Sequence, residues 1–143
     1  MIEIDGFQHS GSGTIVRYSA ALAAFSYRDL HLINIRAKKE KPGLRAQHLK
    51  ALEALGEITQ GTLEDGHMGS AEIYFKSGRI IRGGEYEWNI GTAGSTTIMA
   101  VSILPVAAFA DRSAAFKIAG GLFQDSPRRH IIWSSPCCLC FRK

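Results

Sequence analysis

A stretch rich in positive charge lies between two apolar segments of the chain. It runs from Ile33 to Leu49 and reads INIRAKKEKPGLRAQHL. Against a single acid, Glu40, it carries five cations within ten residues: Arg36, Lys38, Lys39, Lys41 and Arg45. A basic loop between a strand and a helix can hold a chain of phosphates. Most charge runs are solvated surface segments, however, so charge alone leaves both interpretations open.

Two turns of small residues are further possible anion sites. GFQHSGSG at 6–13 and GTAGS at 91–95 each precede a segment with helical character. The first amides of a helix have no partner inside the helix and attract anions, although such a turn alone is more often a plain helix cap. Neither turn is a Walker loop, because no GKS or GKT follows. If Arg17 converged with Arg36, the two side chains would clamp a phosphate.

The histidines do not identify a nucleophile. His48 follows Gln47 on a predicted helix, and a histidine on the apolar side of a helix is usually a hydrogen-bonded core residue. His9 could contact a ligand or be solvated, while His31 and His67 are expected at the surface. No Ser/His/Asp order, catalytic carboxylate pair or HExxH motif occurs. We therefore assign no catalytic residue and no metal ligand from spacing.

Length and composition indicate one soluble domain, or one domain cut short. The chain has 143 residues, of which 45% are hydrophobic and 21% charged, and its net charge of +4 is compatible with a nucleic-acid or nucleotide partner. No apolar run has membrane-spanning length and the N-terminus lacks the layout of a signal peptide, so we expect a cytoplasmic protein without a membrane partner. All three cysteines lie in the last seven residues, which argues against a zinc site or a disulfide framework.

The pattern of hydrophobic residues predicts strands and helices that recur. Strands are expected at 2–5, 30–35, 62–63 and 71–75, and helices at 14–26 and 44–59. The first helix has an apolar stripe of Ile15, Tyr18, Leu22 and Phe25, and the second has one of Leu44, His48, Leu52 and Leu55. The pattern restarts with a strand at 85–90, a helix at 97–110 and a strand at 114–118. The period of about 84 residues predicts a duplicated unit, with a first repeat at 1–78, a partial second repeat at 79–125 and a tail at 126–143.

Taken together, these segments resemble the RNA 3'-terminal phosphate cyclase family. The resemblance rests on IEIDG with a following Arg17, NIRAKKEKPGLRAQHL, Gly69-Ser70, GGEYEWNIGTAGS, Leu104-Pro105, the FAD at 109–111 and GGLFQD. The combination of RxxxxKPGLRxQHL with GTAGS is specific, whereas each part alone is not. The resemblance covers residues 1 to about 125.

The resemblance implies an α/β (α+β) fold of repeated βαβαββ units, shared with enolpyruvyl transferases. It implies an enzyme that uses ATP and a divalent metal (Mg or Mn), adenylates a histidine, moves AMP to an RNA 3'-phosphate and closes a 2',3'-cyclic phosphate. The implied partners are the RNA 3' end and ATP. The residues that match family positions near the nucleotide and RNA phosphates are Arg17, Arg36, Lys41, Arg45, Gln47, His48 and Ser95.

Three positions depart from the family pattern. The first turn of the family commonly reads GEGGGQ, but here it reads HSGSGT. Ser10 replaces an acidic residue expected near the metal, and Thr14 replaces a glutamine. Val101 stands where many members carry a glutamine that contacts the nucleotide. These changes put metal and nucleotide binding in question, and a divergent subgroup would account for them.

The family's adenylated histidine is expected far beyond Lys143, so we expect a truncated chain that is inactive alone. An incomplete second repeat leaves an apolar face without a partner, which predicts self-association. The tail SPRRHIIWSSPCCLCFRK differs from the family's continuation, and a shift of one base restores part of that continuation. We therefore expect residues 126–143 to be an out-of-frame tail that packs poorly and binds no metal.

Two other functions are compatible with this pattern. A non-catalytic RNA-binding or ribosome-assembly relative would keep the fold but lack ATP-dependent AMP transfer. An enolpyruvyl transferase-like enzyme would share the fold and consume phosphoenolpyruvate, although the basic string argues against it.

Overall fold

The computed structural model describes residues 1–8, 11–91, 94–121 and 129–135. In chain order these residues form β1 (Ile2–Asp5), α1 (Gly13–Phe25), β2 (Leu30–Ile33), α2 (Ala46–Thr59), β3 (Thr62–Glu64), β4 (Ile73–Lys76), β5 (Glu85–Asn89), α3 (Thr96–Ala107), β6 (Ala114–Gly120) and β7 (Arg129–Ser135). Helices combined with two sheets confirm the predicted α+β class.

Each sheet contains a parallel pair of strands joined through a helix. β1 and β2 precede and follow α1 in the sequence and pair with each other in parallel. β5 and β6 flank α3 in the same way and also form a parallel pair. β4 is antiparallel to both β2 and β3, which gives the strand order β1-β2-β4-β3 in the first sheet. The second sheet has the order β5-β6-β7. A strand–helix–strand unit thus occurs twice, while the proposed repeat limits at residues 78 and 125 stay predictions.

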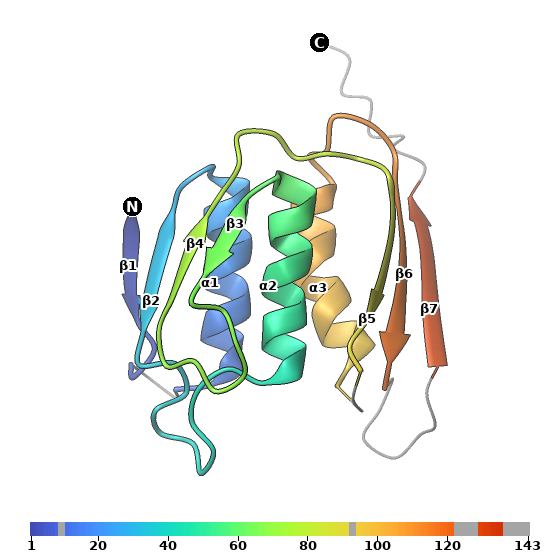
Figure 1. The fold of residues 1–143 in the computed structure, drawn as a ribbon. Coiled ribbons are helices and arrows are strands. Elements are labelled where there is room, and N and C mark those ends of the chain that lie inside the picture. The colour runs from blue at the N-terminus through green and yellow to red at the C-terminus, as the bar shows by residue number, and fades with distance from the viewer. Residues whose placement is uncertain (9–10, 92–93, 122–128, 136–143) are drawn as a thin grey trace.

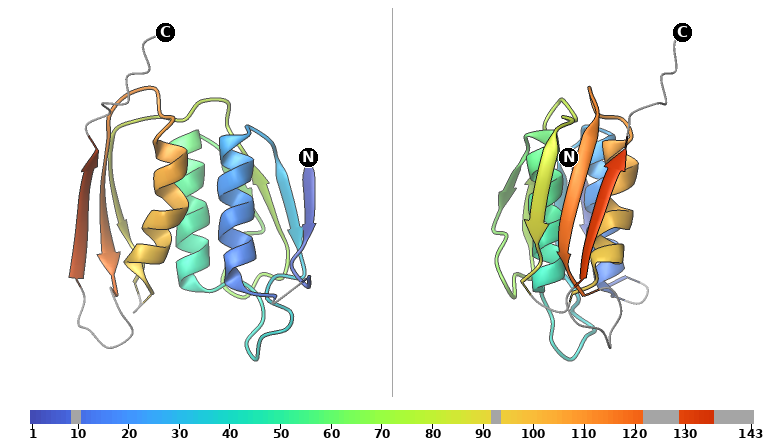
Figure 2. Two further views of the ribbon diagram at one scale, coloured as in Figure 1. Left: turned by 180° about the vertical axis from the view of Figure 1, so that it is seen from behind. Right: turned by 90° about the vertical axis from the view of Figure 1, so that its right-hand side faces the viewer.

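The helices lie between the two sheets, and each of α1, α2 and α3 packs against the other two (Figure 1). They run in the same direction and begin at one end of the molecule, the lower end in Figure 1, where β1 and β2 finish. The rear view in Figure 2 shows α1 and α3 side by side with α2 behind them. Because the N-terminus of a helix carries partial positive charge, this end is suited to anions.

The apolar stripe predicted for α2 lies in the core. Leu44, Leu52 and Leu55 are fully buried, and His48 is 3% exposed. Leu30, Leu32 and Phe75 of the first sheet belong to the same core cluster. Burial of this stripe fixes the rotation of α2 and therefore the direction in which His48 points.

The stripe predicted for α1 is mostly on the surface instead. Tyr18 and Leu22 are at least half exposed, and Phe25 is 44% exposed. The helix buries a face of small residues with one valine: Val16, Ser19, Ala20, Ala23 and Ala24. Small side chains let helices approach closely, and α1 contacts both α2 and α3 through this packing.

An apolar groove with a volume of about 500 Å³ separates the exposed side of α1 from α3. Its lining residues are Tyr18, Ala21, Leu22, Phe25, Val101, Pro105, Val106 and Phe109. The rings of Phe25 and Phe109 meet edge to face across it, with centroids 4.7 Å apart. No charged residue occurs in α3, and the one charged residue in α1, Arg17, is buried. The groove is therefore an uncharged, exposed apolar surface.

Several predicted boundaries differ from the structure by a few residues, and two of them have a clear local reason. β2 ends at Ile33 because Asn34 and Arg36 adopt positive φ angles of 53° and 54°, which turn the chain out of the sheet. α2 begins at Ala46 because the amide of Leu44 donates to the carbonyl of Ser70 over 3.0 Å. Leu44 is thus held by the neighbouring segment instead of by the helix.

The second half of the chain closes with β7, which is antiparallel to β6 over residues 114–120. The backbone of 129–135 is therefore part of the second sheet. The expectation that the tail packs poorly stays a prediction. The three cysteines lie outside the described residues, and the reading frame of the tail stays a prediction. None of the helices in the described residues has the length and apolar character needed to cross a bilayer.

Candidate phosphate-binding site

The basic loop between β2 and α2 is closed by one of its own arginines. Nη1 of Arg36 donates to the carbonyl of Lys41 over 2.9 Å and to the carbonyl of Gly43 over 3.0 Å. The left-handed backbone at Arg36 turns its side chain back over the loop. The other N–H groups of the guanidinium are not used in these bonds and can meet a ligand.

The far end of the loop is anchored to the segment before β4. Gly43 has a φ of +77°, and a Cβ at this position would overlap the carbonyl of Gly69. The amide of Gly43 donates to Ile35 over 2.8 Å, and the amide of Gly69 donates to Leu44 over 2.9 Å. The loop therefore has a fixed shape, and the residue at its anchor must be glycine.

His48 lies where α2 meets the first turn of α1. Its Nδ1 accepts a hydrogen bond from the backbone N–H of Arg45 over 3.2 Å. In the neutral ring the proton is then on Nε2. Nε2 faces Gly13 so closely that a Cβ on that residue would overlap it. The glycine at the start of α1 thus makes room for the imidazole, whose donor points at the N-terminal end of α1.

Three arginines surround this histidine. Burial, and then the charges of Arg17, Arg36 and Arg45, lower the pKa of His48 to about 4. Arg17 is 8% exposed, and burial lowers its pKa; burial and then Arg45 lower the pKa of Arg36. Among the described residues, no ion pair joins any of the three arginines to a carboxylate. A partly buried cluster of cations without counter-ions is typical of an anion site.

The structure thus brings together Arg17, Arg36, Arg45 and His48, four of the residues that the family resemblance selected. Their role in binding phosphate stays a prediction. Lys41 lies in the same basic loop and is exposed. Gln47 lies in the first turn of α2 and is half-buried. Ser95 lies apart as the N-cap of α3, where its Oγ accepts from the amide of Ile98 over 3.3 Å. It is at the same end of the molecule as the cluster, but its described contacts are within the second half (Figure 1).

The family described as RNA 3'-terminal phosphate cyclase matches this chain over residues 8–133. The chain belongs to the RNA 3'-terminal phosphate cyclase family. It is 43% identical to an RNA 3'-terminal phosphate cyclase of Staphylothermus marinus over 136 residues, which are 95% of this chain and 36% of that protein. It is 41% identical to the one of Pyrococcus furiosus over 95% of this chain and 37% of that protein. The chain therefore spans about a third of the length of the curated cyclases it matches.

The positions that depart from the cyclase pattern lie in different surroundings. Thr14 is exposed in the first turn of α1, while Ser10 is outside the described residues. Val101 lines the apolar groove on α3. No cluster of three His, Cys, Asp or Glu side chains that could hold a metal occurs in the described part of the chain. We therefore assign no metal ligand among the described residues.

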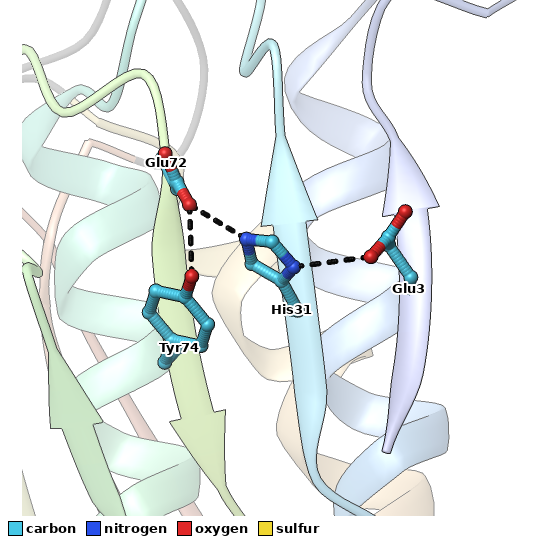
Figure 3. A network of polar contacts seen from close by, with 4 residues as sticks. All are labelled: Glu3, His31, Glu72 and Tyr74. Carbon is cyan, nitrogen blue, oxygen red and sulfur yellow. Dashed lines mark hydrogen bonds and ion pairs between the residues drawn. The ribbon is translucent and has the colours of Figure 1, made fainter.

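A second polar network in this chain lies on the outer face of the first sheet (Figure 3). Nε2 of His31 is 2.7 Å from a carboxylate oxygen of Glu72, and Nδ1 is 3.4 Å from Glu3. The hydroxyl of Tyr74 donates to Glu72 over 3.1 Å, and its ring stacks on His31 at 4.2 Å. The hydrogen bond with Glu72 raises the pKa of His31. The network links three strands and lies apart from the basic loop.

Sequence reasoning missed two contacts of the candidate phosphate site. It gave no role to Gly13, although the close contact with His48 makes this glycine necessary. It also missed Phe7, whose ring lies 4.5 Å from Nζ of Lys38. Both contacts join segments that are distant in the sequence, so local periodicity carries no signal for them.

The low pKa of His48 leads to a prediction about pH. An unfolded histidine has a pKa near 6.5. Between pH 6.5 and about 4 the unfolded chain therefore holds a proton that the folded chain lacks, and the free energy of unfolding falls as pH falls. The full difference is about 3 kcal/mol. Titration of the His48 ring by NMR should give a midpoint near 4, and His48→Gln should flatten the pH dependence of stability. A midpoint near the ordinary histidine value would show that the ring is neither buried nor surrounded by cations.

Proposed function

We propose that this chain binds the terminal phosphate of RNA and the phosphates of ATP, as part of a cyclase that converts an RNA 3'-phosphate to a 2',3'-cyclic phosphate. The observation that carries the proposal is the cluster of Arg17, Arg36 and Arg45 around a neutral histidine. Cations held in place without counter-ions stabilise phosphate oxygens, and phosphoryl transfer depends largely on such positioning. Lys41 and Gln47 belong to the proposed site because they lie in the basic loop and the first turn of α2. Ser95 belongs to it because it caps α3, which begins at the same end of the molecule as α1 and α2.

His48 acts in this proposal as a donor to phosphate. Its Nδ1 lone pair is used by the amide of Arg45, and its Nε2 carries the proton. The ring therefore lacks a free lone pair with which to attack a phosphorus atom. We assign no nucleophile among the described residues, and we expect no cyclisation by this chain alone.

ATP fits the same chemistry, because its phosphates need the cations that the cluster supplies. When bound, ATP would supply the adenylyl group that activates the RNA 3'-phosphate. Arg17, Arg36 and Arg45 would hold its phosphates or those of the RNA. A requirement for Mg or Mn, a role in RNA processing and a cytoplasmic location all follow from the family resemblance and remain part of the proposal.

The salt dependence of RNA binding tests this function. The affinity for a short 3'-phosphorylated RNA should be measured by fluorescence anisotropy at several salt concentrations. Each neutralised phosphate of a single strand contributes about −0.7 to the slope of log affinity against log salt. Two or three phosphates at the cluster give a slope of roughly −1.4 to −2.1. A flat dependence would contradict phosphate binding.

We further propose that the chain self-associates through the groove between α1 and α3, with a second copy as the occupant. The exposed surface of this groove is apolar, and neither helix presents a charge to an identical surface. A two-fold axis across it would place Leu22 of one copy against the groove of the other without like-charge repulsion. Burial of several large apolar side chains favours such contact.

Replacing Leu22 by glutamate tests the self-association. The residue is 65% exposed, so the change should leave the fold intact while placing a charge in the groove. Sedimentation velocity should show a concentration-dependent dimer for the unchanged chain and a monomer for Leu22→Glu. Ile80 is 45% exposed outside the groove, and Ile80→Glu should remain dimeric. A monomer at all concentrations, or a dimer that tolerates the Leu22 change, would exclude this interface.

A further inference from the structure

An exposed aromatic ring stands beside the phosphate site. Phe7 follows β1 at the end of the molecule where the helices begin, and it is 51% exposed. Nζ of Lys38, from the basic loop, lies over its ring at 4.5 Å from the centroid. A large apolar ring at the surface next to a cation is suited to stacking and to attracting negative charge.

The position of this ring is fixed by its neighbours. Asp5 accepts one hydrogen bond from the amide of Phe7 over 2.9 Å and another from the side chain of Asn34 over 3.0 Å. The amide of Gly6 donates to Ile33 over 2.8 Å. The turn that carries Phe7 is therefore tied to the end of β2, and the ring is presented from an ordered backbone.

Lys38 also lies beside Gly11, shortly before α1 begins. A Cβ at Gly11 would lie 3.2 Å from Cβ of Lys38, so the Lys38 side chain packs on the turn. Two residues later, Gly13 contacts Nε2 of His48. Lys38 and His48 thus pack against Gly11 and Gly13, which are two residues apart. Phe7 contacts Lys38, and the arginines lie around His48.

We propose that Phe7 and Lys38 form a stacking platform for the terminal base of the RNA whose 3'-phosphate the cluster binds. This inference rests on the proposed function. A nucleobase joined to a bound phosphate remains close to it, and Phe7 is an exposed aromatic ring that contacts the basic loop carrying Arg36. Stacking on such a ring tolerates every base, because each base has a π-face. The adenine of ATP can stack on the same ring, so the test must distinguish a base of RNA from the base of ATP.

The test compares 3'-phosphorylated RNAs that end in a normal or an abasic nucleotide. With the unchanged chain, removing the terminal base should weaken binding about tenfold, the size of one stacking contact. With Phe7→Ala the normal RNA should bind about as weakly as the abasic one, and Phe7→Trp should restore the difference. Phe109→Ala, which removes another exposed ring away from the site, should leave RNA affinity unchanged.

The outcomes separate the platform from the function on which it rests. If the unchanged chain does not bind 3'-phosphorylated RNA, the proposed function fails and the platform with it. If RNA binding depends on Arg36 but is the same in Phe7→Ala and the unchanged chain, the platform alone is wrong. If Phe7→Ala weakens ATP binding and leaves RNA binding unchanged, the base is adenine and the assignment to RNA is overturned. Thermal melting of Phe7→Ala should match that of the unchanged chain, since the ring is exposed.

Discussion

Replacing Arg36 by alanine should weaken binding of 3'-phosphorylated RNA at least about 30-fold. The change removes a cation of the cluster and the two hydrogen bonds that close the loop on Lys41 and Gly43. Bonds from a charged donor are worth about 1.5–3 kcal/mol, so a loss near 2 kcal/mol is expected. Anisotropy titration should also show a shallower salt dependence, because one fewer phosphate contact is neutralised.

Lys39 offers a matched control for this change. It carries the same charge in the same loop and is exposed, and no described hydrogen bond or ion pair involves its side chain. Lys39→Ala should cost no more than about threefold, as expected for a screened surface charge. Equal losses for the two variants would mean that the loop acts only through its overall charge. Arg36→Lys should bind poorly too, since an ammonium cannot reproduce the planar fork of donors.

Replacing Gly43 by alanine should destabilise the fold by about 3 kcal/mol and weaken RNA binding as a consequence. The backbone at φ +77° disfavours any side chain, and the new Cβ would push the carbonyl of Gly69 away. That movement breaks the bonds that Leu44 makes with Gly69 and Ser70. Urea unfolding followed by tryptophan fluorescence measures the stability change.

A matched variant, Gly69→Ala, separates the cost of the left-handed backbone from the cost of the overlap between Cβ and a neighbouring carbonyl. Gly69 has a φ of +86°, but a Cβ there would meet no atom within 4 Å. Gly69→Ala should therefore cost only the backbone strain, about 1–2 kcal/mol. If the two alanine variants were equally stable, the close contact between Gly43 and Gly69 would not constrain the loop.

Much of the fold was predictable because its elements have strong local signals. The alternation at β1 and β5, the breaker at Pro42-Gly43 and the apolar stripe of α2 correspond closely to what the structure shows. The exposed position of the large apolar side chains of α1 was not predictable from the helical spacing of apolar residues. Large apolar residues suggest a core face, but here Ala20 and Ala23 are buried because close helix packing selects small side chains.

The composition of the candidate site was predictable, but its geometry was not. Family resemblance selected Arg17, Arg36, Arg45 and His48 by type and position. That His48 is neutral, with Nδ1 occupied and Nε2 against Gly13, follows from the packing of α2 on α1. Such contacts join segments far apart in sequence, so only the folded arrangement defines them.

The proposed function depends above all on the cluster around His48 binding the terminal phosphate of RNA. The most direct measurement compares the affinity of this chain for two RNAs of one sequence, one ending in a 3'-phosphate and the other in a 3'-hydroxyl. The cluster predicts that the phosphorylated RNA binds at least about tenfold more tightly and that Arg36→Ala removes the preference. Equal affinity for the two ends would contradict the account, because the cations would then be contacting the RNA backbone without selecting its end.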